Sequence, residues 1–113
     1  MLDWLKTILN LAPREQLIEL ERREPSLEER VERLLGRLGT YSRRTAEELE
    51  EIMADLEKVL DIVEKIISVM ENIGGADRAR NLRMRLRNHR TRARKAYQNL
   101  QNFREPGSEQ VFG

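Results

Sequence analysis

The most regular pattern in this chain is the spacing of apolar residues between Leu49 and Ile73. The steps between them alternate between three and four, as on the buried face of a coiled-coil helix. The seam consists of Leu49, Ile52, Leu56, Val59, Val63, Ile66, Met70 and Ile73. Met53, Leu60 and Ile67 each lie one position beyond a seam residue and widen the stripe, which favours a helix of a bundle.

Gly74 and Gly75 follow this helix, and glycine supplies the left-handed residue that commonly ends a helix. A second helix is predicted over Arg78–Arg104, with Asp77 as its cap. Its seam is Ala79, Leu82, Leu86, His89, Ala93, Ala96, Leu100 and Phe103. Because the connection is short, the two helices should form an antiparallel hairpin.

The N-terminal part predicts a series of shorter helices. Met1–Leu11 is amphipathic, and Pro13 suits the first position of a helix that we expect to end before Pro25. Ser26 and Glu29 have the spacing of a capping box for a following helix over Leu27–Tyr41. We expect a turn or kink near Gly39–Arg44, and an unbroken helix through that point stays open. Thr45 and Glu48 repeat that spacing before the central helix, which should begin at Ala46.

The predicted fold is therefore all-α: an antiparallel, coiled-coil-like helical hairpin with an N-terminal helical arm. We assign the arm to residues 1–44, the hairpin to residues 45–104 and a flexible tail to residues 105–113. A lone hairpin would leave much of both seams uncovered, so we expect a homodimer with a four-helix core.

The amino-acid composition argues against disulfides, thiolate metal sites and membrane-spanning helices. The chain has no cysteine, which removes disulfide frameworks and thiolate metal sites. No apolar run approaches the roughly 20 residues of a membrane helix, and no signal-peptide pattern begins the chain. We expect a cytoplasmic or nuclear protein that is not secreted.

The N-terminal and C-terminal parts of the chain differ strongly in charge. Residues 1–73 carry 11 Lys/Arg against 17 Asp/Glu, whereas residues 74–113 carry 10 against 3. Nine cations and no acid lie between Arg78 and Lys95. One row on the predicted helix steps by three and four and spans about 21 Å. This row is Arg80, Arg83, Arg87, Arg90 and Arg94, and a second row contains Arg78, Arg85, Arg92 and Lys95.

Unpaired like charges at these spacings destabilise a helix, so an outside group should compensate them. Nucleic-acid phosphates fit such a row, and a rigid helix that makes repeated phosphate contacts reads the shape of a duplex and not its sequence. Our first hypothesis is therefore non-specific binding of duplex RNA or DNA, with RNA favoured. The expected contacts are Arg80, Arg83, Arg85, Arg87, Arg90, Arg92, Arg94 and Lys95.

Other interpretations of these features stay open. The arginines could pair with acids of the chain's own N-terminal arm, Glu15–Glu32, or of a second copy, as the salt-bridged face of a structural coiled coil. They could also pair with acidic helices of a protein partner, which would make the protein a scaffold or adaptor. The segment Met1–Leu11 could lie on a membrane surface with Trp4 at the headgroups, although Lys6 is its single cation. The chain is also similar to viral silencing suppressors that bind duplex RNA, in size and general layout alone, so no residue role carries over.

We find no catalytic constellation. His89 is the single histidine, lies on the helical seam and has no ExxH or HExxH spacing around it, so we predict neither a metal nor a cofactor. The serines have no base placed to activate them, and Gly74–Gly75 lacks the lysine of a phosphate loop. We expect a binding protein and not an enzyme.

Overall fold

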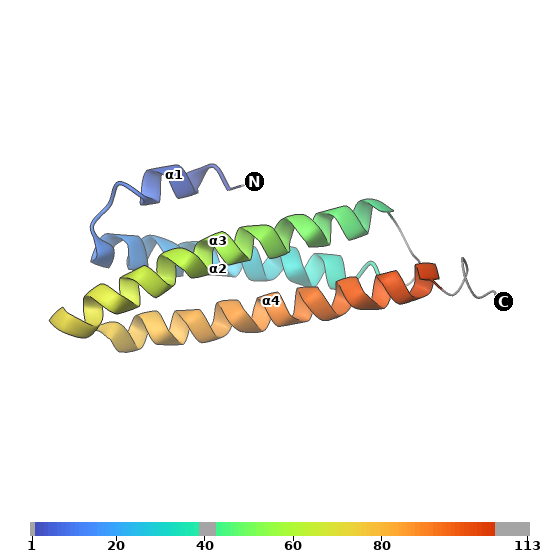
Figure 1. Cartoon of the computed structure of the whole chain (residues 1–113). Helices are drawn as coiled ribbons and strands as arrows, with labels where there is room; N and C mark the ends of the chain where they lie inside the picture. The colour runs from blue at the N-terminus through green and yellow to red at the C-terminus, as the bar shows by residue number, and fades with distance from the viewer. Residues whose placement is uncertain (1, 39–42, 106–113) are drawn as a thin grey trace.

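A computed structural model describes residues 2–38 and 43–105, the last three for their backbone only. The described chain is all-helical and contains no strand. The helices are α1 (Trp4–Ile8), α2 (Pro13–Leu35), α3 (Arg43–Ile73) and α4 (Ala76–Glu105). In Figure 1 the three long helices lie side by side, and α1 packs beside them near the end where α3 turns into α4.

Helix α2 runs unbroken through Pro25, so the predicted break at Pro25 and the cap at Ser26 are wrong. Proline in a helix interior removes a hydrogen bond and costs about 3 kcal/mol. Tertiary packing offsets this cost, because a single stripe continues across the proline. The buried residues of this stripe are Leu17, Leu20, Glu24, Leu27, Val31 and Leu34, again in steps of three and four.

The other helix ends also differ from the prediction. Helix α3 begins at Arg43, so Thr45 lies inside it as a buried residue and does not cap it. Helix α2 ends at Leu35, short of the expected Tyr41, and the predicted turn at residues 39–42 lies outside the described part of the chain. Helix α4 starts at Ala76, with Asp77 in its first turn.

The reversal between α3 and α4 occurs at the two glycines, as predicted. Gly74 and Gly75 have φ values of 96° and 88°, in the left-handed region that side chains with a Cβ rarely adopt. Gly74 N–H donates to the carbonyl of Met70 at 2.7 Å, which closes the last turn of α3.

The core lies between α2, α3 and α4. From Leu49 to Met70 every residue of the α3 seam is buried, and so are Leu82, Leu86, His89 and Leu100 of α4. Ile73 corrects the prediction: it is 56% exposed, because it is the last residue of α3 and the chain turns away there. The side chain of Phe103 lies outside the described part.

Helix α2 covers the flank of the hairpin that we expected a second copy to cover. Leu60, Ile62 and Ile67 are buried within the single chain, and Met53 is half-buried. Val69 of α3 stays 42% exposed, so the open-seam argument for a dimer loses most of its basis.

The short α1 is docked by its apolar side, with Leu5 and Ile8 buried. Gln16 Nε2 donates to the carbonyl of Ile8 at 3.1 Å, and the Arg23 guanidinium stacks 5.1 Å from the centroid of the Trp4 ring. The apolar face of α1 that a membrane anchor would insert into lipid is therefore packed against the bundle.

Candidate functional site

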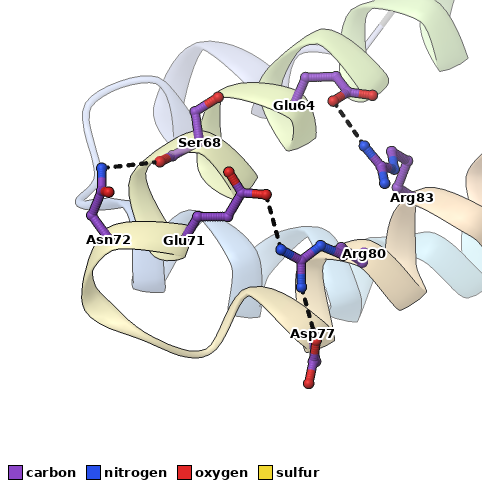
Figure 2. Close-up of polar contacts among 7 residues, drawn as sticks. All are labelled: Glu64, Ser68, Glu71, Asn72, Asp77, Arg80 and Arg83. Carbon is purple, nitrogen blue, oxygen red and sulfur yellow. Dashed lines mark hydrogen bonds and ion pairs between the residues drawn. The ribbon is translucent and has the colours of Figure 1, made fainter.

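The first arginine row of α4 faces acids of α3. Arg80 contacts Glu71 at 2.9 Å, and Figure 2 shows this pair beside the contact of Arg83 with Glu64 at 3.0 Å. Two further pairs continue along the interface: Arg87 with Glu64 at 3.0 Å, and Arg90 with Glu57 at 2.7 Å. Glu64 therefore serves two arginines one helical turn apart.

The second row of α4 faces acids of α2. Arg78 contacts Glu21, Arg85 contacts Glu24 at 3.4 Å, and Arg92 contacts Glu32 at 2.7 Å. The hydrogen bond that Arg78 donates to Glu21, and then the charge of Glu21, raise the pKa of Arg78. The hydrogen bond that Arg80 donates to Glu71 is the largest of the effects that raise the pKa of Arg80.

These pairs change what the arginine rows indicate. Seven of the nine cations between Arg78 and Lys95 contact a carboxylate of the same molecule. Within the described residues, Arg94 and Lys95 form no ion pair. The basic helix is flanked on both sides by acidic helices, as charged positions flank the seam of a coiled coil. The premise that the arginines require an outside anion is thereby removed for most of the row.

The structure also brings together two polar residues within the core. Glu24 is 7% exposed and His89 is 4% exposed, and Glu24 Oε2 lies 2.6 Å from His89 Nε2. The other oxygen, Oε1, accepts from Arg85 Nε at 3.4 Å. His89 Nδ1 is buried and makes no hydrogen bond within the described chain.

Sequence reasoning placed His89 on a seam but missed Glu24. The signal was present: Glu24 occupies a position of the α2 stripe where every other buried member is aliphatic. The mistaken helix break at Pro25 hid this stripe, because it divided it immediately after Glu24.

A groove of about 530 Å³ opens at the end of the bundle where α3 turns into α4. Its apolar walls come from α2 and α3, and Gly74 and Gly75 contribute backbone. The lining residues are Arg14, Leu17, Ile18, Met70, Ile73, Gly74, Gly75 and Arg78. Ile18 is 50% exposed and Ile73 is 56% exposed, so two large aliphatic side chains are accessible at this groove.

Comparison with protein-family models, with curated proteins and with solved structures finds no match for this chain. Among the helices that the structure describes, none has the length and apolar character needed to cross a membrane. Any functional proposal therefore has to be argued from the geometry of the chain itself.

Proposed function

We propose that this protein is a protein-interaction module that binds an acidic amphipathic helix in the groove at the Gly74–Gly75 end of the bundle. The observation that carries the proposal is the coincidence of exposed aliphatic side chains with an open groove. Helix-in-groove recognition uses apolar anchors at one face of the bound helix, and Ile18 and Ile73 supply a matching surface.

The charge at the rim favours an acidic partner. Arg14 and Arg78 stand on the groove; Arg78 is shared with Glu21, while Arg14 forms no ion pair among the described residues. Rim charges of this kind steer association and select the partner more than they add affinity.

Peptide binding tests the proposal. A fluorescein-labelled helical peptide with leucines at i, i+3 and i+7 and glutamates on its flanks should bind the full-length protein, as measured by fluorescence anisotropy. The matched peptide with lysines in place of the glutamates should bind at least tenfold more weakly, a difference of about 1.4 kcal/mol.

Two substitutions locate the site. Ile73→Glu should abolish binding, because it places a charge in the apolar groove, whereas Met84→Glu serves as the control. Met84 is an exposed apolar residue of α4 outside the groove lining. Equal affinities of the two variants for the acidic peptide would overturn the proposal. So would the absence of binding at 100-micromolar protein, a concentration that detects a binding free energy of about 5.5 kcal/mol.

A homodimer through the same groove is the alternative occupant. Sedimentation equilibrium distinguishes a peptide-binding groove from a dimer interface. The free chain should sediment as a monomer of 13.4 kDa. A dimer of twice that mass, which the Ile73→Glu variant no longer forms, would assign the groove to a second copy.

Nucleic-acid binding remains the second candidate, favoured by one specific observation. On α4, Arg87 is 52% exposed despite its pair with Glu64, and Arg94 and Lys95 are exposed. Exposed ion pairs are worth about 0–1 kcal/mol, so a polyanion could compete for such arginines.

A labelled 20-base-pair duplex RNA tests this candidate. Affinity should fall steeply as salt rises, since binding releases counterions, and the triple change of Arg87, Arg94 and Lys95 to Gln should flatten that slope. Absence of binding at low salt would remove the candidate.

A further inference from the structure

The exposed residue Glu28 lies beside the buried contact between Glu24 of α2 and His89 of α4. Glu24 and Glu28 are four residues apart on α2, which places them one turn apart on the same face. His89 faces them from α4. One ligand atom from each of the three side chains lies within 4.8 Å of the others.

We propose that Glu24, Glu28 and His89 form a binding site for a divalent transition-metal ion of the zinc class. Imidazole nitrogen combined with carboxylate oxygens is a donor set that suits zinc, cobalt, nickel and copper, whereas magnesium and calcium prefer oxygen ligands alone. Three protein ligands would leave the fourth position of a tetrahedral ion to water.

The adjustment that binding requires is small. Glu24 Oε2 and His89 Nε2 are separated by the 2.6 Å of a hydrogen bond, and two ligands of one tetrahedral zinc ion stand about 3.3 Å apart. For this pair the shift is below 1 Å, and the proton shared by the two atoms leaves when the ion binds. The three ligand atoms lie within 4.8 Å of one another, so Glu28 must close by up to about 1.5 Å, which rotation of its side chain can supply. Glu28 is exposed, so it can close on the ion from the solvent side.

Arg85 holds the carboxylate that the site depends on. Its Nε donates to Glu24 Oε1, which leaves Oε2 directed at His89. Carboxylate ligands of metals are commonly fixed by such outer hydrogen bonds. His89 Nδ1, in contrast, makes no hydrogen bond within the described chain, and an unsupported imidazole typically costs 10–100-fold in affinity. We therefore expect micromolar and not nanomolar binding.

The chain offers an unusually clear spectroscopic test, because His89 is its single histidine and it has no cysteine. Tag-free, metal-free protein titrated with Zn²⁺ in a calorimeter should bind one ion per chain. Loaded with Cu²⁺, the protein should show an imidazole nitrogen in electron spin-echo spectra, and this signal can come from His89 alone.

Glu28→Gln is the decisive variant, since an exposed residue can be changed without disturbing the core. It should weaken Zn²⁺ binding by roughly tenfold or more, as removal of one of three ligands requires. Glu29→Gln, the exposed acid next to it, is the matched control and should bind as the original protein does. His89→Gln should abolish binding and the imidazole signal.

The thermal midpoint provides an independent measurement that does not depend on the His89 variant folding. Zn²⁺ should raise the midpoint of the unaltered protein progressively with metal concentration, because the ion binds the folded state. It should raise that of Glu28→Gln much less. Equal zinc affinities of Glu28→Gln and Glu29→Gln, or copper spectra without imidazole nitrogen, would overturn the proposal.

Discussion

Glu24 divides its two carboxylate oxygens between two bases of α4, Arg85 and His89, at the centre of an otherwise aliphatic interface. Residue preferences alone do not explain a carboxylate there, because burial of a charge is costly unless it is paired and hydrogen-bonded. Both conditions hold at this position. The contact also joins α2 to α4 at one point along their length, so it can fix the register between the two helices.

Replacement of Glu24 by Gln should therefore destabilise the protein. The amide keeps the shape but loses the charge that Arg85 and His89 face, and hydrogen bonds to charged groups contribute about 1.5–3 kcal/mol. We expect the free energy of unfolding in urea to fall by about 2 kcal/mol. Glu29→Gln should remain within about 0.5 kcal/mol of the original protein. Equal values for both variants would show that the buried contact contributes nothing to stability.

The backbone at Gly74 and Gly75 predicts how alanine at each position changes the stability of the protein. Alanine at Gly74 or Gly75 would have to adopt a left-handed backbone, at a cost of about 1–2 kcal/mol. A Cβ at Gly75 would also lie 2.9 Å from the end of the Met70 side chain, whereas at Gly74 no atom lies within 4 Å. Thermal unfolding should therefore show Gly75→Ala to be the less stable of the two variants; the reverse order would contradict the packing at the turn.

At the scale of elements, the sequence predicts best where one apolar period continues without a conflicting signal. The seams of α3 and α4 and the glycine turn follow directly from spacing, because period and burial coincide there. Helix α2 carries a local signal that opposes its period: Pro25 predicts an end, while the stripe from Leu17 to Leu34 requires continuation. Packing against α3 and α4 keeps α2 helical through Pro25, and the strength of that packing cannot be inferred from local helix propensity.

The candidate site was less predictable than the fold for the same reason. The two arginine rows could be read from the sequence, and the acidic N-terminal arm was among the partners left open. Which acids face which arginines depends on where α2 lies, and the predicted break in α2 left that position undetermined. Once α2 is continuous, its acids at Glu21, Glu24 and Glu32 come within reach of α4.

If packing maintains α2 through its proline, removal of the proline should stabilise the protein. Pro25→Ala restores a backbone N–H that can donate to the carbonyl of Glu21 and removes the ring from the helix interior. We expect the free energy of unfolding to rise by about 2 kcal/mol, a little below the intrinsic helix cost of proline, because the unfolded chain also gains freedom. Ser26→Ala, the exposed neighbour, should change little. A loss of stability in Pro25→Ala would mean that the packing of α2 depends on the shape that proline imposes.

At the scale of the whole molecule, charge is segregated by helix and balanced by packing. Helix α4 carries ten Lys/Arg and two Asp/Glu, whereas α2 and α3 together carry nine Lys/Arg and sixteen Asp/Glu. The acidic helices lie on either side of the basic one, so attraction between helices favours this arrangement and penalises a packing in which α4 is left without them. The chain thus carries in one molecule the acidic and basic partners that its sequence suggested for an assembly.

Because these pairs are exposed or only partly buried, their contribution should be individually small and sensitive to salt. Glu64 accepts from both Arg83 and Arg87, so Glu64→Gln removes two contacts at once and should lower the free energy of unfolding by about 1 kcal/mol at low salt. Asp61→Asn, an exposed acid of the same helix, removes the same charge without either contact and corrects for net charge. At 1 M NaCl, where the screening length falls to about 3 Å, the difference between the two variants should shrink towards zero. A difference between the two variants that persists at high salt would show that Glu64 stabilises α4 through packing of its side chain and not through its charge. A negligible difference at low salt would show that the segregation of charge selects the arrangement of helices without stabilising it.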